Sequence, residues 1–125
     1  MTVLVDSDIL IEVSRARDTE VVAPWIALSR QDDVGLYSPI SAAELWAGAR
    51  PAEHEALNRL FDALMCVGVD AATGRQAGDY LRHYGKSHAV ELGDALIAAA
   101  AVLNHAALWT GNNWKHYPMK DVAFF

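Results

Sequence analysis

Residues 1–13 read MTVLVDSDILIEV, and this stretch indicates how the chain folds. The apolar run Val3–Val5 has the composition of a buried strand, and an apolar pattern at helical spacing resumes soon after it. Between the two lie Asp6 and Asp8. The helix that follows needs one acid or hydroxyl as its cap, which Ser7 or Asp8 can supply. Asp6 is therefore a candidate functional residue at the end of a strand, whereas Asp8 is interpreted as a cap or a support for the turn.

The rest of the chain alternates short β-type runs with helical patterns. In the helical segments apolar residues recur at i, i+3, i+4 and i+7. This alternation predicts βαβ units, and hence an α/β fold with a mostly parallel sheet covered on both faces. Ligands of such sheets bind beyond the carboxyl ends of the strands, so the residues that follow each strand are the candidate site. The predicted strands are Val3–Val5, Val34–Ser38, Cys66–Val69, Ala107–Thr110 and Val122–Phe125, and helices are predicted over residues 8–16 and 73–86.

Length and composition limit the class of protein. A chain of 125 residues is expected to form one domain, residues 1–125. The longest apolar run, Ala95–Leu103, is far shorter than the ~20 residues that cross a bilayer, and no signal segment opens the chain. We therefore expect a cytoplasmic protein with no membrane partner. The single cysteine, Cys66, is expected in the core. A formal charge of −6 argues against broad attraction to nucleic acid, although carboxylates gathered around a cation still accept a phosphate.

Two further acids occupy the same kind of position as Asp6. Glu44, in SPISAAELWAGAR, follows the second predicted strand, and a capping box with Ser41 is the competing interpretation. Asp94, in VELGDALIAAAAVLN, lies in the first turn of a helix that is apolar nearly all round and is therefore expected at the centre of the fold. Because an unpaired buried charge is costly, Asp94 is interpreted either as a helix cap or as a cation ligand.

The fourth position is the segment LWTGNNWKHYPM, which contains the end of a predicted strand. Gly-Asn-Asn is ordinary turn chemistry, and the alternative is a loop that orients water or contacts a phosphate. Clustered carboxylates would raise one another's pKa values unless a cation lay among them. Oxygen ligands without a Cys or His pair favour Mg²⁺ or Mn²⁺ over zinc. The candidate side chains of this segment are Thr110, Asn112, Asn113, Lys115 and His116.

In this order, VDSDILI, ISAAELWAGAR, ELGDALIAAAAVLN and LWTGNNWKHYPM resemble the PIN-domain ribonucleases, and most closely the VapC-type toxins of toxin–antitoxin pairs. The resemblance implies a three-layer α/β/α PIN-like domain with a sheet of four to five strands. It implies that Asp6, Glu44 and Asp94 are catalytic metal ligands of a Mg²⁺- or Mn²⁺-dependent endoribonuclease. It further implies a homodimer and a VapB-like antitoxin whose C-terminal segment blocks the site. At the fourth position of the family pattern, this chain has a neutral side chain, either Asn112 or Asn113.

The expected reaction is hydrolysis of RNA that leaves a 5′-phosphate and a 3′-hydroxyl, with Asn112 assisting the three carboxylates. Two alternatives stay open. An apolar strand that ends in D-x-D also begins haloacid-dehalogenase-type phosphatases, in which Asp6 would be a covalent nucleophile. The other is a non-catalytic interaction module that kept the fold, and Trp46 is interpreted either as an interface residue or as a core residue. The expected supporting and substrate-binding residues are Ser7, Thr110, Asn113, Lys115 and His116.

Overall fold

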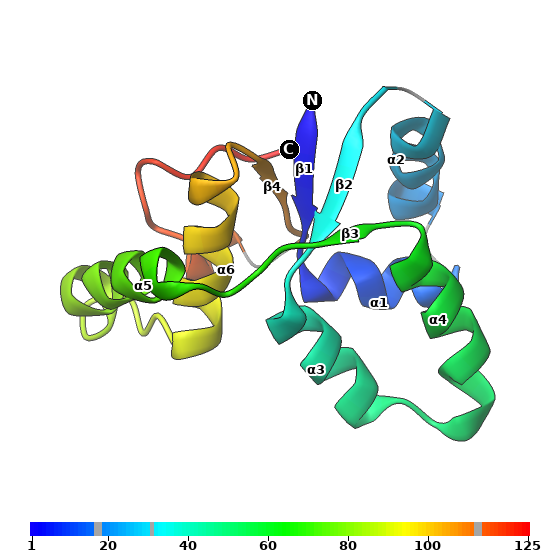
Figure 1. The fold of residues 1–125 in the computed structure, drawn as a ribbon, viewed down its shortest axis with the longest axis horizontal. Helices are drawn as coiled ribbons and strands as arrows, with labels where there is room; N and C mark the ends of the chain where they lie inside the picture. Colours follow the sequence, from blue (N-terminus) through cyan, green and yellow to red (C-terminus); the bar gives the residue numbers. More distant parts are fainter. Residues whose placement is uncertain (17–18, 31, 112–113) are drawn as a thin grey trace.

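The computed structural model describes residues 1–16, 19–30, 32–111 and 114–125. Within these residues, four parallel strands form a sheet in the order β3-β2-β1-β4 (Figure 1). The central strand β1 pairs Leu4 with Leu36 of β2 on one side and with Leu108 of β4 on the other. The strands are β1 (Thr2–Val5), β2 (Val34–Tyr37), β3 (Met65–Cys66) and β4 (Ala107–Trp109).

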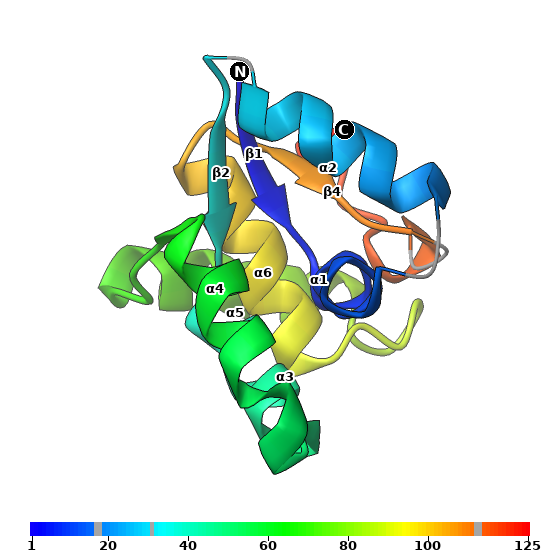
Figure 2. The ribbon, with the colours of Figure 1, turned by 90° about the vertical axis from the view of Figure 1, so that its right-hand side faces the viewer.

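Helices cover both faces of this sheet, which confirms the predicted α/β class and its three layers. Helices α5 and α6 lie on one face, and α1, α2 and α4 lie on the other (Figures 1 and 2). Helices α3 and α4 extend beyond the carboxyl ends of the strands (Figure 1). The helices are α1 (Ser7–Arg15), α2 (Thr19–Arg30), α3 (Pro39–Gly48), α4 (His54–Asp62), α5 (Ala71–Tyr84) and α6 (Leu92–Leu103), with short 3₁₀ helices η1 (Pro51–Glu53) and η2 (Trp114–His116).

Side chains along the strands alternate between two apolar cores. On β1, Leu4 joins the core under α5 and α6, whereas Val3 and Val5 join the core under α1 and α4. Successive residues of a strand point to opposite faces, so a sheet covered on both sides needs such an uninterrupted apolar run. Helix α6 lies at the centre of the fold, as its all-round apolar pattern predicted. Its alanines at 95 and 98–101 are essentially inaccessible to solvent.

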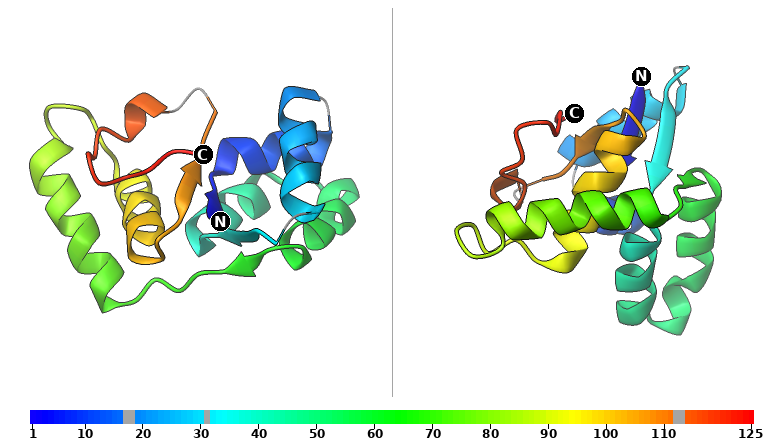
Figure 3. Two further views of the ribbon diagram at one scale, coloured as in Figure 1. Left: turned by 90° about the horizontal axis from the view of Figure 1, so that it is seen from above. Right: turned by 60° about the vertical axis from the view of Figure 1, so that its left-hand side comes forward.

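The order of the strands determines where a ligand can bind. The chain builds outward from β1 to β2 and β3, and then returns to place β4 on the other side of β1 (Figure 3). The direction of winding therefore reverses between β1 and β4. In open parallel sheets the crevice at the carboxyl ends of two such strands is the usual binding site. Asp6 follows β1 and Thr110 follows β4, so both lie at this point.

Two details differ from the sequence-based expectations. The predicted strand Val122–Phe125 makes only a single parallel bridge, between Phe124 and Leu108. Strand β4 is three residues long, and one of its edges faces away from β1. Of its three residues, only Leu108 directs its N–H and C=O to this edge, where they bond the backbone of Ala123 and Phe125. Cys66 is exposed rather than part of the core, because β3 is a two-residue strand at the open edge of the sheet.

The described helices include none with the length and apolar character needed to span a lipid bilayer.

Candidate active site

Asp6 is buried at the end of β1, where three donors meet its carboxylate. It is the N-cap of α1, and its Oδ1 accepts a hydrogen bond of 2.8 Å from the backbone N–H of Ser7. Its Oδ2 accepts from the hydroxyls of Thr110, at 3.0 Å, and Tyr117, at 2.8 Å. Only 4% of Asp6 is exposed. The cap of α1 is therefore Asp6 rather than Ser7 or Asp8, but capping uses only one of its two oxygens.

Asp8 supports the turn, as the sequence suggested, and also fixes the loop after β4. Its Oδ1 accepts from the N–H of Ile9 at 2.9 Å, and its Oδ2 accepts from the N–H of Gly111 at 2.8 Å. Partial burial and the negative charge of Asp6 raise the pKa of Asp8, and the bond from Gly111 opposes this rise. Asp8 thus ties the start of α1 to the segment that leaves β4.

Glu44 does not form the capping box that was the competing interpretation. Helix α3 begins at Pro39, and its cap is Ser38, whose hydroxyl accepts from the N–H of Ile40 at 3.1 Å. Proline suits the first position of a helix because its missing N–H would have no partner there. Ser41 instead accepts a buried hydrogen bond of 2.8 Å from the Ser7 hydroxyl. The carboxylate of Glu44 is therefore not engaged in capping and lines the pocket described below.

The pKa of the Glu44 carboxyl is raised above its usual value. Partial burial is the main cause that raises its pKa, and the charges of Asp6 and Asp94 raise it further. The nearby side chain of Ser7 lowers this pKa and so opposes these effects. A carboxylate with a raised pKa beside other carboxylates is typical of a site that accommodates a cation.

Asp94 caps α6, which is one of the two roles that the sequence left open, and it also lines the pocket. It is the third residue of α6, and its Oδ2 accepts from the backbone N–H of Glu91, the N-cap, at 3.4 Å. The same oxygen lies 4.0 Å from Nδ1 of His116. Partial burial raises the pKa of Asp94, the charge of Asp6 adds to this rise, and the bond from Glu91 and the proximity of His116 oppose it. The capping bond is long, so Asp94 remains a candidate ligand as well as a cap.

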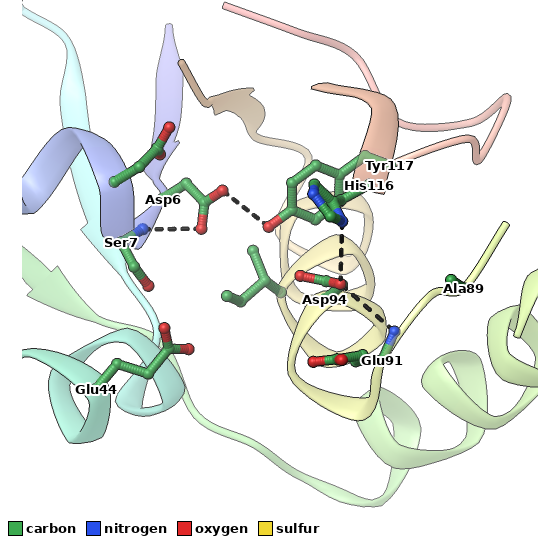
Figure 4. A pocket seen from close by; sticks show the side chains of 10 residues that line it. Asp6, Ser7, Glu44, Ala89, Glu91, Asp94, His116 and Tyr117 are labelled. Carbon is green, nitrogen blue, oxygen red and sulfur yellow. Dashed lines mark hydrogen bonds and ion pairs between the residues drawn. The ribbon is translucent and has the colours of Figure 1, made fainter. Parts of the chain in front are cut away.

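These side chains surround one pocket of about 330 Å³ (Figure 4). They come from the junction of β1 and α1, from α3, from α6 and the residues before it, and from the segment at η2, which are far apart in the sequence. The described residues that line the pocket include five carboxylates and no lysine or arginine. The lining residues are Asp6, Ser7, Asp8, Glu44, Ala89, Glu91, Asp94, Ile97, His116 and Tyr117.

The donors of this pocket fit a hard divalent cation in their chemistry. They are carboxylate and hydroxyl oxygens, which Mg²⁺ and Mn²⁺ prefer. Among the described residues, no three His, Cys, Asp or Glu side chains converge closely enough to hold a metal ion directly. Mg²⁺ usually keeps several of its water molecules, so carboxylates spaced around a pocket can hold it partly through water.

The structure brings together most of the residues that the sequence indicated. Asp6, Ser7, Glu44, Asp94 and His116 line the pocket, and Thr110 bonds Asp6. Lys115 is exposed on η2 and does not line the pocket, whereas Asn112 and Asn113 lie outside the described residues.

The sequence-based reasoning did not identify Tyr117 or Glu91 as pocket residues. Glu91 could have been found, because an acid three residues before Asp94 is consistent with a reciprocal cap. No feature of the sequence predicts the bond from Tyr117 to Asp6, because this bond depends on how the chain turns back after β4.

The parallel sheet and the acidic pocket at its switch point characterise one class of protein. Comparison with known families shows which class this is. The sequence model of the PIN domain matches residues 3–118, and the chain belongs to this family. Ribonuclease VapC10 of Mycobacterium tuberculosis is 38% identical over 118 residues, which cover 94% of this chain and 86% of the relative. The predicted family, fold class and enzyme class are thus confirmed. Family membership argues against the haloacid-dehalogenase alternative.

Solved structures share the fold over nearly the whole chain. The structure of VapBC2 from Rickettsia felis bound to a DNA fragment from their promoter matches with a TM-score of 0.84 at 18% identity, covering 100% of this chain and 98% of that one. The structure of FitAcB from Neisseria gonorrhoeae matches with a TM-score of 0.72 at 27% identity, covering 98% of this chain and 96% of that one. The α/β architecture is therefore that of known PIN-fold structures.

Proposed function

We propose that this chain is a Mg²⁺- or Mn²⁺-dependent endoribonuclease that acts as the toxin of a toxin–antitoxin pair in the cytoplasm. The observation that carries the proposal is the acidic pocket at the switch point, where Asp6, Glu44 and Asp94 face a common space. It occurs in a PIN-domain chain that is 38% identical to a protein named as a ribonuclease. The 125 residues act as a single domain.

Asp6, Glu44 and Asp94 would hold the cation, in part through water. A bound divalent cation acidifies a water molecule and stabilises negative charge on a phosphate. Around it, the chain's own residues have separate tasks. The Thr110 hydroxyl and the backbone N–H of Ser7 hold the carboxylate of Asp6 by hydrogen bonds. Asn112 or Asn113 would be the neutral fourth group of the site.

His116 and Lys115 would contact phosphates of the RNA. His116 lines the pocket and is about half exposed, and Lys115 is exposed on the same short helix η2. Because the pocket itself offers carboxylates and no lysine or arginine among its described residues, an RNA strand would meet positive charge only at the rim or through the cation. Affinity for RNA is therefore expected to depend strongly on the divalent cation.

The proposed partners are a VapB-like antitoxin and a second copy of this chain. The support is that several structures with the same fold are toxin–antitoxin complexes, among them one from Klebsiella pneumoniae. Trp46 on α3 is 37% exposed and packs edge-on against His54 at 5.4 Å between ring centroids, so it is available as an interface residue. Co-purification with the product of an adjacent small basic reading frame tests the antitoxin partner, and light scattering tests the homodimer.

Cleavage of total cellular RNA with Mn²⁺ tests the enzyme proposal. New 5′ ends are mapped for the wild type, for Asp94→Asn and Glu44→Gln, and for Glu55→Gln as a matched control. Glu55 is an exposed acid of α4 that pairs with Arg59 at 3.7 Å, so its loss should leave cleavage unchanged.

We expect discrete 5′-phosphate ends that vanish in the two pocket variants and persist in the control. New 5′-hydroxyl ends, with a 2′,3′-cyclic phosphate on the other fragment, would contradict hydrolysis by water. Such products require attack by the ribose hydroxyl. Cation binding without cleavage of any RNA would favour the interaction-module alternative.

A further inference from the structure

Tyr117 directly follows η2, and its hydroxyl contacts Asp6 at the end of β1. Its residue is 4% exposed, and it belongs to the apolar core under α5 and α6 together with Met119 and Val122. The packing fixes where the phenol can lie, and its hydroxyl ends 2.8 Å from Oδ2 of Asp6 at the wall of the pocket (Figure 4). The proposed function assigns this hydroxyl no task.

The hydrogen bonds of Asp6 can be counted against what a carboxylate can accept. Its two oxygens offer roughly four acceptor positions. Oδ2 already accepts from Thr110 and Tyr117, and Oδ1 accepts from the N–H of Ser7. The remaining position therefore lies on Oδ1. The two hydroxyls also prevent the carboxylate from rotating, because rotation would leave both of these hydroxyls without their acceptor.

We propose that Tyr117, together with Thr110, is a positioning residue that holds Oδ2 of Asp6 and leaves Oδ1 as the single acceptor position for a divalent cation. This inference rests on the proposed function. The hydroxyl of Tyr117 is the donor in its bond to Oδ2 of Asp6. Hydrogen-bond partners of a metal ligand typically contribute about 10–100-fold to metal affinity or activity.

The chain contains a matched control for this tyrosine. Tyr80 of α5 is 5% exposed, lies in the same apolar core, and donates to Asp121 at 2.9 and 2.8 Å from the two carboxylate oxygens. Neither Tyr80 nor Asp121 lines the pocket. Loss of either phenol hydroxyl removes one buried hydrogen-bonding group and keeps the aromatic ring. Asp121 is exposed and Asp6 is buried, so water replaces the Tyr80 hydroxyl more readily and Tyr80→Phe should cost less stability. Of the two losses, only that of the Tyr117 hydroxyl should alter cation binding.

The experiment compares Tyr117→Phe, Tyr80→Phe and Thr110→Val with the wild type. Calorimetry measures Mn²⁺ binding, thermal unfolding measures stability, and RNA cleavage gives kcat and KM. We expect Tyr117→Phe to weaken Mn²⁺ binding about 10–100-fold and to lower kcat more than it changes KM. Tyr80→Phe should bind Mn²⁺ as the wild type does. Thr110→Val removes the other hydroxyl from the same oxygen, so its effect on Mn²⁺ binding should be coupled to that of Tyr117→Phe.

Failure of the inference differs from failure of the proposed function. If folded Tyr117→Phe and Thr110→Val both bind Mn²⁺ like the wild type, the positioning role is overturned, although the nuclease proposal stands. Equal losses of Mn²⁺ affinity in Tyr117→Phe and Tyr80→Phe overturn it as well, because they would follow from stability alone. If the wild type itself neither binds Mn²⁺ nor cleaves RNA, the proposed function fails first. If Tyr117→Phe does not fold, Thr110→Val decides the outcome.

Discussion

Replacement of Gly111 by alanine tests how the loop after β4 is fixed. A Cβ atom on Gly111 would lie 2.7 Å from Oδ2 of Asp8, closer than nonbonded carbon and oxygen atoms approach in proteins. That oxygen is also the acceptor of the Gly111 N–H, at 2.8 Å. The Asp8 side chain must therefore move, and the hydrogen bond must stretch or break.

The expected cost is about 1–2 kcal/mol of unfolding free energy. Overpacking typically costs ~1–3 kcal/mol, and a hydrogen bond to a charged group contributes ~1.5–3 kcal/mol. Asp8 is half-buried, so water replaces part of what is lost and the lower part of the range applies. Urea unfolding of a domain of this size, with a slope of about 1–3 kcal/mol per M, resolves such a change.

The control is Gly78→Ala in α5, where an added Cβ meets nothing within 4 Å. This variant should gain about 0.5–1 kcal/mol because alanine is the better helix residue. The decisive measurement repeats Gly111→Ala in an Asp8→Ala background, where both the obstacle and the acceptor are gone. There the substitution should cost little, which gives a coupling energy of about 1–2 kcal/mol. An equal loss of stability in both backgrounds would refute the contact with Asp8 as the cause.

Three further outcomes follow from the structure. Ser38→Ala removes the buried cap of α3 and should cost about 1 kcal/mol in urea unfolding, whereas Ser29→Ala, at an exposed hydroxyl of α2, should change stability by less than about 0.5 kcal/mol. In the presence of a chelator, the thermal stability of the wild type should fall as the pH rises above about 4.5. The pKa values of Glu44 and Asp94 are raised in the folded state, which therefore binds more protons than the unfolded chain in this pH window. Asp94→Asn should flatten this pH dependence, and an unchanged slope would contradict the explanation. Saturating Mn²⁺ should raise the thermal midpoint of the wild type. The expected gain in unfolding free energy is about 2.7 kcal/mol at a concentration one hundred times the Kd. An equal rise in Glu44→Gln would show that the ion binds elsewhere.

The fold could be predicted from the sequence where local pattern and burial agree. The run Val3–Val5 and the alanines of α6 are apolar without interruption, and both are buried on all sides. The start of α3 was harder, because SPIS and SAAE both read as helix starts. Ser38 is the cap since Pro39 needs no partner for its nitrogen. The C-terminal segment could not be placed, because pairing with β4 depends on the edge that a three-residue strand presents.

The candidate site was predictable to the extent that position along a strand determines it. Asp6 follows β1, Asp94 lies in the first turn of α6, and Glu44 lies in the helix after β2. The parallel topology brings these positions to one crevice. Thr110 was expected as a supporting residue and does bond Asp6, but other contacts that hold the site were not predictable. The bonds from Tyr117 to Asp6 and from Gly111 to Asp8 join residues more than 100 positions apart and depend on tertiary packing. Local sequence contains no information on such pairs.

The distance along the chain between these partners also determines when the pocket can be completed during synthesis. The hydroxyls that hold Asp6 are synthesised 104 and 111 residues after it. Until then β1 also lacks β4, its neighbour on one side. A nascent chain that already contains all of α1 to α6 still has an unsupported Asp6 carboxylate. Translation order therefore leaves the carboxylate of Asp6 without these two donors until the segment that follows α6 has been made.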